Sequence, residues 1–288
     1  YIMNKGLVIA MTAALLTGST AVDAQDVNIG KSNIVLSSDV MTPEALWAMG
    51  RIASVKPSPD GKNIVYQVGY YSVKENKGHQ VLRVMDATGK NDRLLTTSAK
   101  SESDPIWLDN NTIAYLSGGQ LWTMDANGGN RKQLTHSDLD IEGFKFSPNK
   151  KQVVLIKSIP YYGTIAKNPD DLDKTTGLLI NDMNYRHWDH YVQTNTHPFL
   201  AEVTAAGVSE GVDIMEGEPF ESPVAPFGGI EQIDWSKDSK KIAYTSRKKE
   251  GVQYAISTDT DIYLYDIASK TTINLCKPAG YQEPKIDA

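Results

Sequence analysis

The chain has 288 residues, of which 40% are hydrophobic and 22% charged, so it can bury a sizeable core and is too apolar for a disordered chain. Its 29 Lys and Arg against 35 Asp and Glu leave a net charge of -6, which excludes a globally basic surface for nucleic acid or an anionic membrane. The single cysteine, Cys276, excludes an internal disulfide framework and a multi-cysteine metal site.

The first residues have the pattern of a secretory signal peptide. A positive start at residues 3–5 precedes an apolar run at 6–16, which is too short to span a bilayer as a stable helix. Val22 and Ala24 occupy the positions before a cut where signal peptidase needs small side chains. We therefore expect cleavage after Ala24, export to the periplasm, and no membrane attachment after cleavage.

A short pattern of strand, polar turn and strand recurs along the chain. Asp and Asn cap such turns, and Gly or Asn accepts the positive φ that they need. The pattern occurs four times, at residues 55–66, 106–115, 144–155 and 233–244. A second pair of alternating strands follows three of these, at 81–96, 120–135 and 261–275. Four strands per unit define one blade of a β-propeller.

The spacing of the four units indicates an insertion. Tyr66, Tyr115, Leu155 and Tyr244 are 49, 40 and 89 residues apart, and the first two values are near the roughly 40–45 residues of a propeller blade. The third spacing leaves either a hidden blade or a long insertion in the third blade. Six prolines and the lack of a fifth turn pattern at about 160–230 favour the insertion.

The predicted fold class is all-β, a partial β-propeller of about four four-stranded blades preceded by a signal peptide. A β-sandwich also alternates strands and turns, but four units with the same internal order favour the propeller. The predicted organisation is a signal peptide at 1–24, a lead-in segment at 25–45 and an incomplete propeller at 46–288.

The repeats resemble the N-terminal propeller of the prolyl oligopeptidase superfamily of serine peptidases. More specific are Asn-Tyr-Arg-His-Trp-Asp-His-Tyr at 184–191 with the run at 197–203, and Ser-Thr-Asp-Thr-Asp-Ile-Tyr-Leu at 257–264. These runs resemble the dipeptidyl-peptidase 5 and acylaminoacyl-peptidase branch, and the resemblance covers about residues 40–288.

The resemblance implies removal of dipeptides, or of single blocked residues, from the N-termini of oligopeptides, with the propeller filtering substrates by size. It also implies an α/β-hydrolase domain with a Ser, an Asp and a His in that order. We expect that domain to be absent from these residues and to act in cis in a longer parent. We expect the chain by itself to have no peptidase activity.

One sequence matches the pattern of a nucleophile elbow, Gly207-Val208-Ser209-Glu210-Gly211. An elbow needs a buried strand before the serine and a helix after it, and its histidine follows the serine in the chain. All five histidines precede Ser209, and the flanking residues indicate strands. We therefore predict a hairpin turn here and no catalytic residue in the chain.

A metal site is the second chemical hypothesis, because His187, His190 and His197 lie near Asp182 and Asp189. Histidines three residues apart share a face only on a helix, and nothing in this stretch caps one. We predict no metal and no cofactor.

The candidate substrate-binding residues are Tyr185, Arg186, Trp188, Asp189 and Glu202. If the chain serves an exopeptidase, a carboxylate is needed for the free α-amino group, and Asp189 and Glu202 are candidates for this pair. Arg186 could hold a peptide carbonyl, and Tyr185 and Trp188 could wall an apolar pocket. The alternative is structural: Arg186 pairs with Asp189 and Trp188 packs the loop onto its blade.

Two non-enzymatic functions remain open from the residues alone. One is a periplasmic propeller that binds a protein partner and resembles TolB, and the other is a complete binding module of few blades. For the peptidase, the expected partners are an oligopeptide substrate and the α/β-hydrolase domain, with no nucleic acid.

Overall fold

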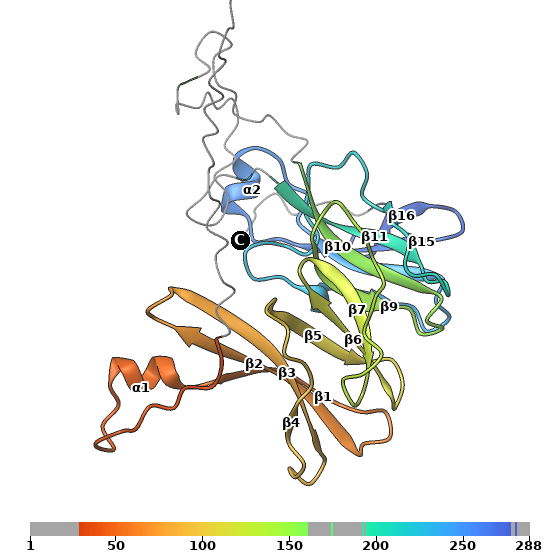
Figure 1. The fold of residues 1–288 in the computed structure, drawn as a ribbon. Helices are drawn as coiled ribbons and strands as arrows, with labels where there is room; N and C mark the ends of the chain where they lie inside the picture. Colours follow the sequence, from red (N-terminus) through yellow and green to blue (C-terminus); the bar gives the residue numbers. More distant parts are fainter. Residues whose placement is uncertain (1–28, 161–173, 175–191, 193, 278–279, 281–288) are drawn as a thin grey trace, which may run out of the picture.

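The computed structural model describes residues 29–160, 174, 192, 194–277 and 280 (Figure 1). The predicted signal peptide at 1–24 lies outside these residues, so its cleavage stays a prediction. In the part of the chain that is described, no helix combines the length and apolar character needed to cross a membrane.

Four antiparallel sheets of four strands follow one another along the chain (Figure 1). In each sheet the strands pair in sequence order. The first sheet contains β1 (Arg51–Pro57), β2 (Asn63–Ser72), β3 (Lys77–Asp86) and β4 (Arg93–Leu94). The second contains β5 (Glu102–Trp107), β6 (Thr112–Ser117), β7 (Gln120–Asp125) and β8 (Lys132–Gln133). The predicted partial propeller is confirmed.

The third and fourth sheets have the same order. The third contains β9 (Ile141–Phe146), β10 (Gln152–Pro160), β11 (Thr194–Glu202) and β12 (Val212–Asp213). The fourth contains β13 (Ile233–Trp235), β14 (Lys241–Ser246), β15 (Asp261–Asp266) and β16 (Thr271–Asn274). Two strands of the third sheet, β11 and β12, therefore lie inside the stretch at about 160–230 where the sequence predicts an insertion.

Three short helical turns complete the described elements: α1 (Pro43–Ala48), η1 (Ile230–Gln232) and α2 (Val252–Ile256). Thr42 caps α1, because its side-chain oxygen accepts a hydrogen bond from the backbone N–H of Ala45 at 3.2 Å. The helix extends away from the four sheets (Figure 1). It crosses the predicted boundary between the lead-in segment and the propeller.

Each of the four predicted turns is closed by a hydrogen bond from or to a side chain. A side chain at the end of the first strand bonds to the turn and holds it closed, as turn-capping Ser, Asp and Asn do. The hydroxyl donors and their acceptors are Ser58 with Asp60 (2.7 Å), Ser147 with Asn149 (2.9 Å) and Ser236 with Asp238 (2.6 Å). In the second sheet, Asp109 instead accepts from the backbone N–H of Thr112 at 2.7 Å.

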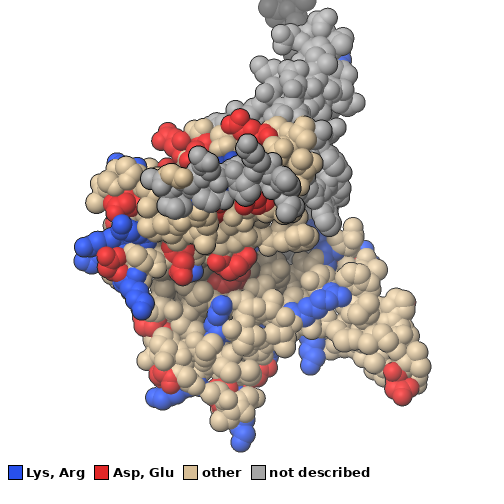
Figure 2. Space-filling view, turned by 180° about the vertical axis from the view of Figure 1, so that it is seen from behind, with Lys and Arg blue, Asp and Glu red and all other residues tan. Residues whose placement is uncertain are grey.

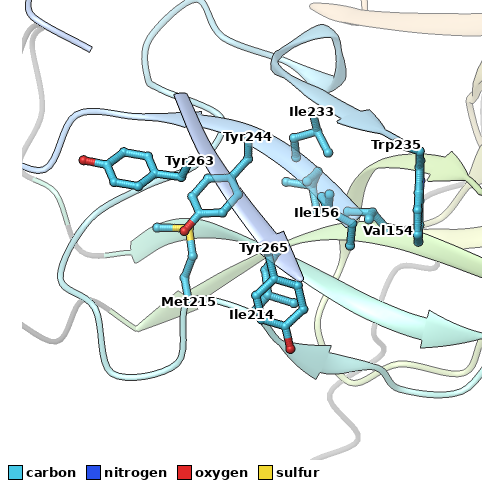
Figure 3. Packing of buried hydrophobic residues seen from close by; sticks show 10 residues of the cluster. Val154, Ile156, Ile214, Met215, Ile233, Trp235, Tyr244, Tyr263 and Tyr265 are labelled. Carbon is cyan, nitrogen blue, oxygen red and sulfur yellow. The ribbon is translucent and has the colours of Figure 1, made fainter. Parts of the chain in front are cut away.

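The core lies between consecutive sheets and follows the period-two pattern of the strands. On β10, Val153 and Leu155 pack toward the second sheet, and Val154 and Ile156 pack toward the fourth (Figure 3). The rings of Tyr244 and Tyr263 stack in the second of these layers, with centroids 5.5 Å apart. Each sheet therefore depends on its neighbours for burial, as propeller blades do.

Indole hydrogen bonds tie the first strands of neighbouring sheets together. Trp107 on β5 donates its Nε1–H to the carbonyl of Lys56 on β1 at 3.0 Å. Trp235 on β13 donates in the same way to the carbonyl of Lys145 on β9 at 2.9 Å. Two sheet interfaces thus repeat one contact.

We expect Trp235→Phe to lower the free energy of unfolding by about 1–2 kcal/mol, because the Lys145 carbonyl loses its donor while most of the apolar ring is kept. Urea unfolding followed by circular dichroism measures the change. Trp47→Phe is the matched control, since Trp47 is 43% exposed on α1, and it should change stability by less than about 0.5 kcal/mol. Equal effects of the two substitutions would contradict the role of the Trp235 bond.

A buried carboxyl group lies between the first and second sheets. Glu102, on β5, is 1% exposed; it accepts a hydrogen bond from the Thr96 hydroxyl and pairs with Arg131 at 2.5 Å. Removal from water raises the pKa of Glu102 to about 7, although the Arg131 guanidinium opposes the change. The folded chain therefore binds this proton more tightly than the unfolded chain does.

We expect this group to make stability fall with rising pH. Its contribution is fully present below the unfolded pKa near 4.5 and is lost as pH rises through about 7. Between pH 5 and pH 8, the Glu102→Gln variant should gain about 1–3 kcal/mol in free energy of unfolding relative to the unaltered chain. Urea titrations at several pH values test this, and a constant difference between the two proteins would contradict it.

The described residues carry both signs of charge on the face shown in Figure 2. On this face, Lys and Arg lie among Asp and Glu. Several of these charges are paired, such as Arg83 with Asp92 at 2.7 Å and Lys145 with Asp234 at 3.0 Å.

Candidate functional site

Two long connections meet at one end of the third and fourth sheets. Residues 214–232 join β12 to β13, and residues 247–260 join β14 to β15. The start of β13 pairs with the end of β14, with Ile233 opposite Tyr244, so both connections emerge at the same end. Connections on a rigid set of strands are common places for binding residues.

His197 on β11 fixes the first connection. Its ring is 0% exposed, with Nδ1 at 2.8 Å from Asp213 Oδ2 and Nε2 at 2.8 Å from the Phe220 carbonyl. The neighbouring Thr196 donates its hydroxyl to the Pro223 carbonyl at 3.0 Å. This part of β11 therefore holds residues 220–223 against the third sheet.

A buried charged cluster joins the two connections. Glu221 from the first accepts a hydrogen bond from the Tyr254 hydroxyl, and Arg247 from the second lies 3.7 Å from its carboxylate. The Arg247 guanidinium also covers the Tyr254 ring, 4.4 Å from its centroid. Burial, together with the Glu221 charge, raises the pKa of Tyr254 to about 12, so the phenol stays a hydrogen-bond donor at neutral pH.

A pocket of about 410 Å³ opens beside this cluster. Its size is within the range of small-ligand sites. Arg247 is its charged lining residue, and Phe227, which is 82% exposed, is part of its wall. The remaining lining residues are Val224, Ala225, Pro226, Gly228, Gln232, Thr258 and Thr260. It combines an apolar wall with a few polar groups.

Four of the predicted substrate-binding residues, Tyr185, Arg186, Trp188 and Asp189, lie outside the described residues. The fifth, Glu202, is the last residue of β11. The first residue of this strand, Thr194, is the one in β11 that is nearest in sequence to residues 185–189. Glu202 accepts a hydrogen bond from the Gln152 side chain at 2.8 Å and is exposed. The nine residues of β11 separate its two ends by about 26 Å. The role of Glu202 in binding an α-amino group stays a prediction.

Ser209 lies in the predicted hairpin between β11 and β12. Val203 bridges Val208, and the Ser209 hydroxyl accepts the backbone N–H of Glu202 at 2.9 Å. Its surroundings are strand, turn and strand, which is not the geometry of a nucleophile elbow. The hairpin prediction is confirmed.

For the metal hypothesis, His187, His190, Asp182 and Asp189 lie outside the described residues. The contacts of His197 with Asp213 and the Phe220 carbonyl hold its ring in the fold. Among the described residues, no group of three or more His, Cys, Asp or Glu side chains is placed to hold a metal.

The pocket beside Arg247 is the part of the site that sequence reasoning missed. Arg247 follows a strand in a run of positive residues, Arg-Lys-Lys, which resembles an ordinary solvated turn. Only its buried position in the fold separates it from its two lysine neighbours.

The fold defines the class of protein: a partial β-propeller. It is similar to acylaminoacyl peptidase of Pyrococcus horikoshii, with a TM-score of 0.54, 13% identity, and coverage of 78% of this chain and 32% of that one. A second acylaminoacyl peptidase, in complex with Z-Gly-Gly-Phe-chloromethyl ketone, gives a TM-score of 0.54 at 11% identity over 80% of this chain and 33% of that one. These likenesses concern the fold.

Comparison with sequence relatives shows a similarity to one type of peptidase. Dipeptidyl-peptidase 5 of Porphyromonas gingivalis is 39% identical over 278 residues, which is 95% of this chain and 40% of the relative. Dipeptidyl-peptidase 5 of Porphyromonas endodontalis is 37% identical, over 83% of this chain and 35% of the relative. No family model matches the chain. The predicted resemblance is confirmed: the chain is related to the dipeptidyl-peptidase 5 branch and spans about 40% of its curated relative's length.

Proposed function

We propose that this chain is the propeller part of an exported serine exopeptidase that removes dipeptides or single blocked residues from oligopeptides. The observation that carries the proposal is the 39% identity to a dipeptidyl-peptidase 5 over nearly the whole chain. The propeller then limits access to a catalytic α/β-hydrolase domain by size.

The outer face of the last sheet supports a larger assembly. Tyr263 and Tyr265 on β15 pack toward the third sheet, so Ile262 and Leu264 point the other way. Ile273 on β16 pairs with Leu264 and shares that face, where Ile262 is 46% exposed and Ile273 is 57% exposed. Apolar faces of this kind are suited to packing against further blades.

The proposal is tested by expressing the complete reading frame that contains this chain. We expect the purified protein to release dipeptides from dipeptidyl-4-nitroanilides, and a variant with the serine of its Gly-x-Ser-x-Gly motif changed to alanine to be inactive. The chain of 288 residues is the matched control and should have no such activity. An inactive complete protein, tested on both dipeptidyl and N-acylated substrates, would refute the proposal.

Recognition of the substrate amino group by Asp189 or Glu202 is part of this proposal. A carboxylate pairs with a free α-amino group and has no cationic partner in a blocked one. In the complete protein, Asp189→Ala should lower kcat/KM for peptides with free N-termini about tenfold or more, and should leave N-blocked substrates unchanged. Glu202→Ala is compared in the same assay. Unchanged kinetics on free N-termini for both variants would remove this role.

Export is likewise proposed from the sequence pattern at residues 1–24. Mass spectrometry of the protein from the periplasmic fraction should give a mature N-terminus at Gln25. A protein that keeps residues 1–24 or stays in the cytoplasm would contradict it.

A further inference from the structure

Buried polar groups without partners gather at one place in the described fold. Nearly all buried polar atoms in proteins are hydrogen-bonded, so each exception needs an explanation. Among the described residues, the buried side-chain atoms without a hydrogen-bond partner belong to Asn195, Glu218, Ser222 and Arg247. All four lie on β11 or on the two connections that frame the pocket. Glu218 does form an ion pair with Lys248, at 2.5 Å.

Of the two charged residues in this group, Arg247 is the one without an ion-pair partner at hydrogen-bond distance. The residue is 5% exposed, and its Nε and Nη2 have no hydrogen-bond partner among the described residues. The Glu221 carboxylate is 3.7 Å from Nη2, too far for a hydrogen bond, and its Oε1 accepts from the Tyr254 hydroxyl instead. Nε and Nη2 carry hydrogens on the same edge of the planar guanidinium, and this edge fits the two oxygens of a carboxylate.

The surroundings favour a ligand with one negative charge. Glu221 already offsets the charge of Arg247, and Lys249 pairs with Asp259 at 3.0 Å nearby. A dianionic phosphate would place three negative charges around one guanidinium, whereas a carboxylate adds one and satisfies both free donors. The hydroxyl-bearing Thr258 and Thr260 also line the pocket and are exposed to an incoming ligand.

The wall beside Arg247 favours an apolar group next to that carboxylate. Val224, Pro226 and Phe227 line the pocket, and Phe227 is 82% exposed. We propose that this pocket binds a peptide carboxylate, with the Nε and Nη2 edge of Arg247 donating to its oxygens and an apolar side chain lying against residues 224–227. The inference that the ligand has a carboxylate depends on Arg247 alone. The inference that this ligand is a peptide depends on the proposed function.

The test uses the chain itself and three blocked dipeptides, measured by isothermal titration calorimetry. The probes are N-acetyl-Ala-Phe with a free carboxylate, its C-terminal amide, and N-acetyl-Phe-Asp amide, which carries its carboxylate on a side chain. We expect at least one of the two acids to bind about tenfold or more tightly than the amide. The comparison of the two acids distinguishes a C-terminal from a side-chain carboxylate.

Variants then assign the preference to Arg247. Arg247→Gln should abolish the preference for the acid, and Arg247→Lys should weaken it severalfold because an ammonium cannot match two oxygens along one edge. Arg93→Gln is the control, since Arg93 is exposed and donates to the Ala126 and Asn127 carbonyls. If Arg247→Gln does not fold, Thr258→Val with Thr260→Val, at exposed positions of the same pocket, should weaken acid binding severalfold.

Equal affinities of both acids and the amide for the unaltered chain, including no binding of any probe, would overturn the proposal. So would an unchanged acid preference in a folded Arg247→Gln protein. The proposed function fails separately: a complete protein without peptidase activity would leave the carboxylate preference of this chain intact, and an active one could still lack the preference.

Discussion

Replacing Leu155 with alanine is expected to lower the free energy of unfolding by about 2–5 kcal/mol, among the largest single losses in the fold. Leu155 lies at the middle of β10 and is 0% exposed. It packs with Leu116 and Leu121 of the second sheet, so its removal opens a cavity between two sheets. Since single domains are stable by about 5–15 kcal/mol, a loss of this size is a large part of the total.

Urea unfolding of the chain measures this loss. Leu46→Ala is the matched control, because Leu46 is 47% exposed on α1 and alanine favours a helix. We expect its effect to stay within about 0.5 kcal/mol. If Leu155→Ala cost no more than Leu46→Ala, the layer between the second and third sheets would not be a packed core.

The second large effect is expected for His197→Ala, at about 3–5 kcal/mol. The substitution removes the ring partner of Asp213, whose side chain is 10% exposed, and the partner of the Phe220 carbonyl. The Asp213 carboxylate and the Phe220 carbonyl would each lose a hydrogen bond, and residues 220–223 would be attached to β11 only through Thr196.

His136→Ala is the control for a lost imidazole, because His136 is exposed. Its effect should be below about 1 kcal/mol. A double-mutant cycle with Asp213→Asn isolates the contribution of the His197–Asp213 pair. A loss below about 1 kcal/mol for His197→Ala would show that the first connection is held in another way.

The blades could be predicted from the sequence because turn chemistry is local. Ser-x-Asp and Ser-x-Asn place the capping hydroxyl and its acceptor two residues apart, and the structure shows these bonds at Ser58, Ser147 and Ser236. The alternation of β15 likewise predicted a strand, which begins at Asp261. Even the strand and turn around Ser209 followed from its neighbours.

The site could not be predicted in the same way because its contacts join distant residues. Arg247 meets Glu221 across 26 positions in the chain, and nothing in the Arg-Lys-Lys run indicates which cation is buried. The indole bond from Trp235 to Lys145 spans 90 residues and depends on how two sheets pack. The sequence neighbours of His197 make it a candidate metal ligand, whereas its described contacts join two segments of the fold.

The central claim, that this chain is the propeller part of a serine exopeptidase, is tested most directly by reading the coding DNA beyond the codon for Ala288. We expect the frame to continue into a Gly-x-Ser-x-Gly elbow followed by an aspartate and a histidine, the order of an α/β-hydrolase triad. A stop codon directly after Ala288, or a longer frame without that order of residues, would contradict the claim.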